Sequence, residues 1–324
     1  MSAAAKTGRQ AIRLANQVVN TVVWIVVLLL LVFGFYAIWD SKQVHSAADA
    51  ARYAVYKPSA ENEGLSFQEL QTINADVFAW LTVYGTHIDY PVVQGENNMK
   101  YINTDAKGKY SLSGAIFLDY NSNPDFSDFN SILYGHHMAK QTMFGEIGQF
   151  SDKSYFNARK YGALYYGGQE HGLVFFAFVH ADAYNGSVFQ TKISGREAQQ
   201  AYLDMLMRIA LHTREDVPVT VEDRIVLLST CSANSTNGRD ILIGKITGEI
   251  YSDPFETEKT DKPNIPVIDE LSNLWTQAPI GCRIILAALP FLLILLALVL
   301  TYTKKKKRSL KRRAATPKKG DEQR

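Results

Sequence analysis

Two long apolar stretches flank a central region in which short apolar runs alternate with polar residues. The first, Leu14–Trp39, holds no charged residue and is dominated by Val, Leu, Ile and Phe. The second, Ile284–Tyr302, is also free of charge. Because a helix needs about 20 apolar residues to cross a bilayer, we expect two transmembrane helices, at residues 14–39 and 284–302.

A cleaved signal peptide is the alternative interpretation of the first stretch. The apolar core of such a peptide spans about 7–15 residues and is followed by a small-x-small cleavage site. Here the apolar run Val18–Ile38 is longer, and no clear site of that kind follows it directly. The pattern favours an uncleaved anchor.

Between the two stretches lie short runs rich in β-branched and aromatic residues, most of them separated by Gly, Asn, Asp or Pro. The runs are Trp80–Tyr84, His87–Gln94, Ala115–Leu118, Ser131–Tyr134, Tyr161–Tyr166, Leu173–His180, Val217–Val221, Arg224–Ser229 and Asp240–Ile250. Regular helical crossovers do not alternate with them, so they predict a largely antiparallel, mainly β barrel or sandwich.

Helical spacing of apolar residues interrupts these runs and predicts peripheral helices. The predicted helices are Ser41–Tyr56, Ser66–Asn74, Thr142–Phe150, Asp152–Lys160 and Arg196–Leu211. The expected segments are a cytoplasmic N-terminus (1–13), a transmembrane helix (14–39), a helical stalk (40–65), a central domain (66–251), a linker (252–283), a second transmembrane helix (284–302) and a basic cytoplasmic tail (303–324).

The distribution of charge gives the expected orientation in the membrane. Lys6, Arg9 and Arg13 precede the first span, and the basic run Lys304–Arg313 follows the second. Positive flanks mark the cytoplasmic side, so both termini should lie inside and the central domain outside. Residues 41–283 hold 20 Lys and Arg against 29 Asp and Glu, a mildly acidic balance. The basic tail follows an apolar span, which favours attraction to lipid head groups over nucleic-acid binding.

The chain has two cysteines, Cys231 in the central domain and Cys282 at the edge of the second span. A secreted domain that depends on disulfides normally holds an even set of cysteines within the domain. We therefore expect Cys231 to be a free thiol. An unpaired thiol outside the cytoplasm is prone to oxidation, which points to a function for it.

Three chemically useful side chains stand at predicted strand ends. The run Arg224–Cys231 ends in the cysteine, and Arg239 begins the next strand after the connection Ser232–Gly238. The run Ser131–Met138 ends in Gly, His, His and Met. An imidazole beside a cysteine stabilises the thiolate and later protonates a leaving amine, so Cys, His and Arg form a candidate catalytic set.

Each residue also has a structural interpretation. A single cysteine on an apolar strand is often a small buried residue, a His pair after Gly is often part of a turn, and an isolated Arg is often a surface charge. A metal site is disfavoured because the other histidines, His45, His87, His171, His180 and His212, are scattered and form no spaced ligand set.

Several stretches together resemble the class B sortases, cysteine transpeptidases of Gram-positive surfaces. They are FQELQTINADVFAWLTVYGTHIDYPVVQGENNMKYI (Phe67–Ile102), GAIFLDY (Gly114–Tyr120), NSILYGHHM with TMFGEI shortly after (Asn130–Ile147), and LLSTC with a following R and IGKI (Leu227–Ile246). The resemblance covers most of residues 67–250, implies a sortase-like barrel of about eight strands, and makes 66–251 the catalytic domain.

Matched residue by residue, the resemblance makes Cys231 the nucleophile, His136 the acid/base and Arg239 the residue that stabilises the reacting carbonyl. The histidine is the one directly after Gly135. Successive strand residues point to opposite faces, so we expect His137 to be a neighbour of the site. Ser229, Thr230 and Ser232, beside the cysteine, are candidate substrate-binding residues.

The resemblance also implies a reaction and its partners. A secreted protein bearing a C-terminal sorting signal would be cleaved through a Cys231 thioacyl intermediate, and its acyl group would pass to an amine of a cell-wall peptide. Thiol, imidazole and guanidinium complete this chemistry, so no cofactor and no metal is expected.

Three alternatives remain open. The connection Ser232–Gly238 and the second span resemble pilin-polymerising sortases, which would use a pilin lysine as the amine. A cysteine protease would use water, as hydrolases of this chemistry do. A non-catalytic, membrane-tethered β domain would keep its function without the Cys231 thiol.

Overall fold

The computed structural model describes residues 3–58, 65–231 and 237–256. The predicted linker, second span and basic tail, and Ser232 and Cys282, lie outside these residues. Described helices are α1 (Ala3–Ala47), α2 (Leu65–Ile73), α3 (Lys153–Ala158) and α4 (Arg196–Ile209), with short 3-10 turns between them. Strands are β1 (Val77–Val83), β2 (Asp89–Val93), β3 (Ile116–Leu118), β4 (Asn130–Tyr134), β5 (Tyr161–Tyr166), β6 (Gln169–Asp182), β7 (Ala210–Thr213), β8 (Arg224–Cys231) and β9 (Gly238–Thr247).

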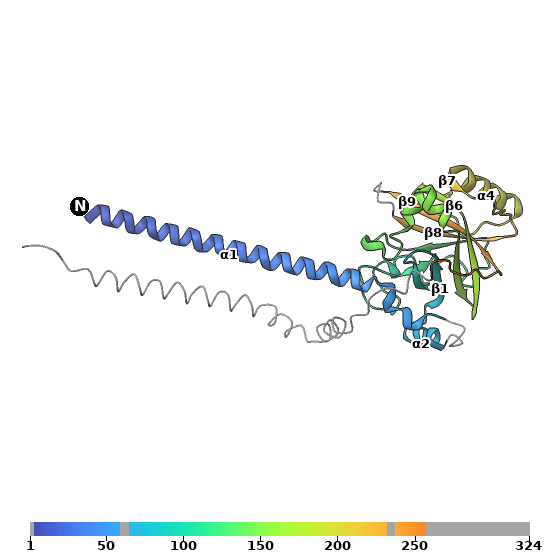
Figure 1. Cartoon of the computed structure of the whole chain (residues 1–324), viewed down its shortest axis with the longest axis horizontal. Helices are drawn as coiled ribbons and strands as arrows, with labels where there is room; N and C mark the ends of the chain where they lie inside the picture. The colour runs from blue at the N-terminus through green and yellow to red at the C-terminus, as the bar shows by residue number, and fades with distance from the viewer. Residues whose placement is uncertain (1–2, 59–64, 232–236, 257–324) are drawn as a thin grey trace, which may run out of the picture. The chain divides into compact units, whose positions relative to one another are not determined.

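The strands form a closed barrel. Their order is β5-β1-β2-β3-β4-β8-β9-β6-β7, and a further pairing of β5 with β6 closes the ring, leaving β7 attached to β6 outside it (Figure 1). The eight-stranded barrel with peripheral helices predicted from the sequence is therefore confirmed. Most pairings are antiparallel, but β2–β3 and β4–β8 are parallel.

The two faces of the central strands bury different apolar clusters. On β8, Val226 and Leu228 belong to the main core. Ile225 and Leu227 belong to a second core that also holds Tyr202, Leu203 and Leu206 of α4. Alternate strand residues point to opposite faces, so one face of β8 meets the main core and the other meets the layer that contains α4.

The helix α1 contains the 26-residue apolar stretch Leu14–Trp39, whose mean hydropathy reaches 2.7 over an 18-residue window. Among the described residues it is the one helix long and apolar enough to cross a membrane. Of the two predicted membrane helices, the structure describes the first, because 284–302 lies outside the described residues. After α1 the chain enters the domain, since Ala48 and Tyr53 are buried in the main core.

Two predicted elements are wrong. Val217–Val221 is not a strand, because Pro218 interrupts it and the Asp223 carboxylate accepts from the backbone N–H of Thr220 at 2.8 Å, closing a turn. The predicted helix Thr142–Phe150 is a loop followed by the 3-10 helix η6 (Ile147–Ser151), and Met143 in it has a left-handed φ of 52°. Strand β7 was missed, and its first two residues fall in the predicted helix Arg196–Leu211.

Candidate active site

The ends of three neighbouring strands bring the candidate catalytic positions into one row. Strands β4 and β8 run parallel, with Tyr134 opposite Ser229, and the Gly135 N–H continues the ladder to the Ser229 carbonyl at 3.2 Å. His136 lies as far beyond Tyr134 as Cys231 lies beyond Ser229. On the other side of β8, Cys231 is the antiparallel partner of Arg239. The backbone register thus orders the three positions as His136, Cys231, Arg239.

The His136 ring is half-buried and oriented by a backbone carbonyl. Its Nε2 lies 2.8 Å from the carbonyl oxygen of Ile102. A carbonyl oxygen only accepts hydrogen bonds, so Nε2 carries the proton and Nδ1 is the nitrogen left to exchange one. His137 instead forms an isolated bridge with Met143, and its buried Nδ1 has no hydrogen-bond partner within the described residues. The two histidines therefore have different surroundings.

Contacts on both sides hold the Ile102 carbonyl in place. It ends the 3-10 helix η4 (Lys100–Ile102), and Asp76 accepts from the Tyr101 hydroxyl at 2.7 Å and from Lys100 Nζ at 2.6 Å. Burial raises the pKa of Asp76, but the hydrogen bonds from Lys100 and Tyr101 outweigh it, so its pKa is lowered overall. On the other side, Gly114 lies close to this carbonyl, since a Cβ at Gly114 would be 2.6 Å from the Ile102 oxygen.

The Arg239 side chain is half-buried, and its Nη1 donates to the Gly238 carbonyl at 3.0 Å. The guanidinium charge also acts on Tyr134. Burial and the Asp119 carboxylate raise the pKa of Tyr134, and the positive charge of Arg239 lowers it by a smaller amount. The Tyr134 hydroxyl donates to Asp119 at 3.2 Å, and Asn98 donates to the same carboxylate oxygen at 2.8 Å. A protonated tyrosine, hydrogen-bonded to a buried carboxylate, therefore lies within the electrostatic reach of the guanidinium.

The candidate substrate-binding residues are only partly described. Ser229 and Thr230 are 1% and 2% exposed, and neither hydroxyl has a hydrogen-bond partner among the described residues. Thr230 is the cross-strand partner of Asp240, which accepts from His180 Nδ1 at 2.6 Å. Ser232 lies in the segment 232–236, outside the described residues. Their roles toward a substrate stay predictions.

The sequence did not single out Ile102 or Tyr134 as parts of the site. Ile102 acts through its backbone carbonyl, which carries no residue-specific signal. Tyr134 looks like any strand aromatic until its neighbours Asp119 and Arg239 are known. What the arrangement offers chemically is a proton-exchanging imidazole, a cysteine position and a fixed positive charge in one row, the combination that acyl transfer through a thioester requires.

Comparison with known proteins gives the family. No family model matches the chain. It is 32% identical over 185 residues to Sortase B of Staphylococcus aureus, covering 56% of this chain and 74% of that one. The crystal structure of sortase B from the type II pilus of Streptococcus pneumoniae matches with 44% identity and a TM-score of 0.50, over 56% of this chain and 99% of that one. Spy0129, a Streptococcus pyogenes class B sortase involved in pilus biogenesis, matches with 44% identity and a TM-score of 0.52, over 57% and 99%.

The barrel, the row of positions at its strand ends and these similarities define a cysteine transpeptidase of the sortase type. The chain belongs to the class B sortases.

Proposed function

We propose that this chain is a membrane-anchored sortase that cleaves a C-terminal sorting signal through a thioacyl intermediate on Cys231 and transfers the acyl group to a cell-wall amine. The observation that carries the proposal is the register of three strands, which brings His136, Cys231 and Arg239 into one row. The resemblance of the surrounding motifs to class B sortases assigns the same three positions.

The first half of the reaction forms the thioester. The step starts from the Cys231 thiolate and a His136 imidazolium that also carries a proton on Nδ1. The thiolate attacks the carbonyl carbon of the sorting signal's scissile peptide, and the C–N bond breaks. The departing amine takes a proton from His136, through Nδ1 because Nε2 is held by Ile102. The products are a thioacyl enzyme and a free C-terminal fragment.

The second half reverses the roles. An incoming amine attacks the thioester carbon, His136 accepts a proton from that amine, and the C–S bond breaks to release the Cys231 thiolate. If water attacks instead, the same steps give hydrolysis, the protease-like side reaction. A solved sortase B complexed with triglycine supports an amine as the acceptor.

Arg239 is proposed to stabilise the oxyanion that develops on the attacked carbonyl. A guanidinium stays charged at every relevant pH and presents several donors. Its half-buried position strengthens such an interaction relative to bulk water. Ser229, Thr230 and Ser232 are proposed to contact the sorting signal beside the cysteine.

The apolar stretch Leu14–Trp39 is proposed as an anchor, with 284–302 as a second span and both termini in the cytoplasm. The catalytic domain would then face outward, where secreted substrates emerge, and the basic tail would meet anionic lipid. Protease protection of a C-terminal tag in intact cells tests this orientation, because a tag accessible from outside would contradict it.

The enzymatic test uses the full-length chain in detergent with a panel of sorting-signal peptides and triglycine. Cys231→Ala and His136→Ala should each abolish the peptide–triglycine product, and Arg239→Ala should lower it by about 100-fold. Cys282→Ala and His137→Ala are the matched controls and should retain most of the activity. Product formation that survives Cys231→Ala would refute the proposal.

A pilin lysine is the second candidate acceptor. The observation that favours it is the 44% identity to two pilus-associated class B sortases, against 32% to the Staphylococcus aureus enzyme. A lysine-containing pilin peptide in the same assay distinguishes the two. Preference for the lysine amine over triglycine would assign pilus assembly, and the reverse would assign wall anchoring.

A further inference from the structure

The loop that carries His136 has an unusual backbone. Three of the four non-glycine residues with positive φ in the described part of the chain lie in it: Lys140 at 59°, Gln141 at 62° and Met143 at 52°. Non-glycine residues avoid this left-handed region for steric reasons and persist there only when neighbouring contacts enforce it. The loop between β4 and η6 therefore depends on outside contacts to keep its shape.

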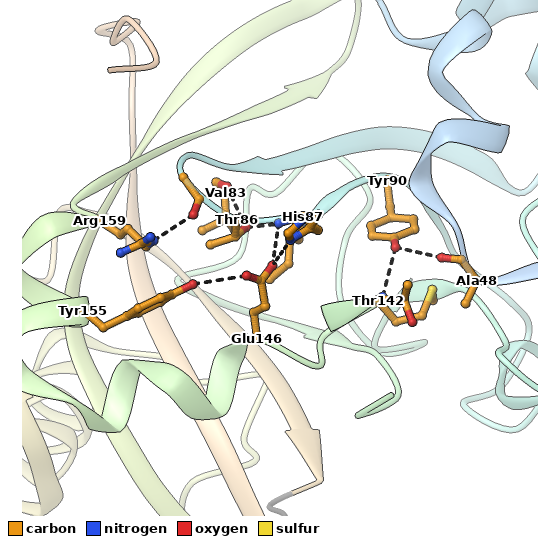
Figure 2. Close-up of polar contacts among 12 residues, drawn as sticks. Ala48, Val83, Thr86, His87, Tyr90, Thr142, Glu146, Tyr155 and Arg159 are labelled. Carbon is orange, nitrogen blue, oxygen red and sulfur yellow. Dashed lines mark hydrogen bonds and ion pairs between the residues drawn. The ribbon is translucent and has the colours of Figure 1, made fainter. Parts of the chain in front are cut away.

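One such contact is at the far end of the loop. Glu146 is 3% exposed and accepts from the His87 backbone N–H at 2.5 Å, from His87 Nδ1 at 3.1 Å and from the Tyr155 hydroxyl at 3.3 Å. Figure 2 shows Glu146 between Tyr155 and the turn that joins β1 to β2. This cluster fixes where the loop ends.

The other contact lies beside the histidine. The hydroxyl of Tyr90, a β2 residue that is 2% exposed, accepts from the Met143 backbone N–H at 3.0 Å. The next residue, Phe144, donates its backbone N–H to the His136 carbonyl at 3.0 Å. The Tyr90 hydroxyl thus holds Met143, which has the left-handed φ. The next residue, Phe144, holds the His136 carbonyl.

The same hydroxyl also reaches the N-terminal segment. It donates to the carbonyl of Ala48 at 2.8 Å, and Ala48 is fully buried directly after α1 ends at Ala47. The bond between Tyr90 and Ala48 is visible in Figure 2. Burial raises the pKa of Tyr90, so the hydroxyl keeps the proton that it donates.

We propose that Tyr90 is a positioning residue for His136, whose hydroxyl ties the chain after the N-terminal helix to the strained loop that carries the histidine. The proposal rests on the proposed function, in which His136 exchanges protons with the amines. Removing the hydroxyl leaves two buried backbone groups, Ala48 C=O and Met143 N–H, without their partner. The loop then relaxes away from the conformation that orients the ring.

The test compares Tyr90→Phe with Tyr202→Phe in the full-length chain. Tyr202 is a matched control because its buried hydroxyl also makes two hydrogen bonds, donating to the Val188 carbonyl at 2.6 Å and accepting from Asn130 at 2.9 Å. Tyr90→Phe should lower kcat for peptide–amine transfer about tenfold with KM for the peptide little changed. Tyr202→Phe should lower the melting temperature similarly and leave kcat nearly intact.

A rescue variant separates positioning from general destabilisation. Glycine tolerates a positive φ, so Gln141→Gly, at an exposed position, favours the native loop conformation. Adding Gln141→Gly to Tyr90→Phe should recover part of the lost kcat. Adding it to Tyr202→Phe should change nothing.

Hydrogen exchange of residues 136–144 gives a readout that needs no activity. Tyr90→Phe should speed exchange in this segment more than Tyr202→Phe does. Equal exchange and equal kcat in the two variants would overturn the proposal. A wild-type chain with no Cys231-dependent transfer would instead refute the proposed function, and the exchange comparison would still decide whether Tyr90 holds the loop.

Discussion

The carbonyl oxygen of Ile102 lies 2.8 Å from Nε2 of His136 and fixes which ring nitrogen carries the proton. A backbone carbonyl on a short 3-10 helix takes the orienting role that a carboxylate side chain has in other catalytic sets. In the proposed reaction, the segments that position this carbonyl therefore act through His136. The first two predictions follow from this contact.

Gly114→Ala should impair catalysis by displacing the carbonyl. A Cβ at this position would lie 2.5 Å from the Tyr101 oxygen and 2.6 Å from the Ile102 oxygen, so the backbone must shift. Misplacement of a catalytic group by about 1 Å can cost about 100-fold, and we expect kcat/KM to fall by at least tenfold. The measurement is steady-state peptide–amine transfer.

Gly108→Ala is the control for backbone strain. Gly108 has a φ of 76°, similar to the 60° of Gly114, but its nearest neighbour to a new Cβ is Asn74 Cγ at 4.0 Å. Both substitutions cost about 1 kcal/mol for the left-handed conformation. Equal losses of activity in the two variants would show that strain, and not the Ile102 carbonyl, is responsible.

The tautomer of His136 is a second consequence. With the ring in its neutral form, nitrogen NMR of the chain labelled on histidine should show His136 protonated at Nε2 and unprotonated at Nδ1. Comparison of the wild type with His136→Gln assigns the signal. A ring protonated at Nδ1 would mean that Ile102 does not orient it and that the proton-transfer route proposed through Nδ1 is wrong.

Asp76 should contribute stability that depends on pH. Its pKa is lowered below the usual 3.8, so the folded state favours the carboxylate, and the contribution is present above pH 3.8 and lost as pH falls through the lowered value. Asp76→Asn should therefore cost about 1 kcal/mol near pH 7, and the gap in melting temperature should shrink near pH 3. A gap that is unchanged at pH 3 would show that the carboxylate charge is not what stabilises η4.

Arg239→Lys should lower kcat by at least tenfold, although it keeps the charge. A lysine ammonium lacks the planar fork of the guanidinium and cannot reproduce two parallel hydrogen bonds. Arg208→Lys, at an exposed position in the last turn of α4, is the control and should have little effect. Full activity of Arg239→Lys would indicate that only the positive charge is needed.

The strand ends that carry the candidate site could be predicted from the sequence, because one apolar run ends at Cys231, another ends just before His136, and a third begins just after Arg239. Which strands are neighbours could not. The parallel pairing of β4 with β8 joins residues about one hundred positions apart, and no local pattern specifies it. The resemblance to class B sortases implied a sortase-like barrel of about eight strands, but it was not used to predict which strands pair.

The loop after His137 shows a different limit. Thr142–Phe150 has apolar residues at helical spacing, yet Met143 and Phe144 are buried because the loop folds back onto the main core. Two tertiary hydrogen bonds hold it: the Tyr90 hydroxyl accepts from the Met143 N–H, and the Glu146 carboxylate accepts from the His87 N–H. Tertiary contacts overrode the local periodicity there, whereas at Val217–Val221 the causes are local, namely Pro218 and the turn closed by Asp223.

The most direct test of the central claim is the intact mass of the full-length chain after mixing with a sorting-signal peptide in the absence of any amine acceptor. The account predicts a mass increase equal to the acyl portion of the peptide, mapped to Cys231, lost on adding hydroxylamine, absent in Cys231→Ala and present in Cys282→Ala. An acyl adduct on another residue, or amine-dependent product with no adduct on Cys231 in any peptide tested, would contradict the account.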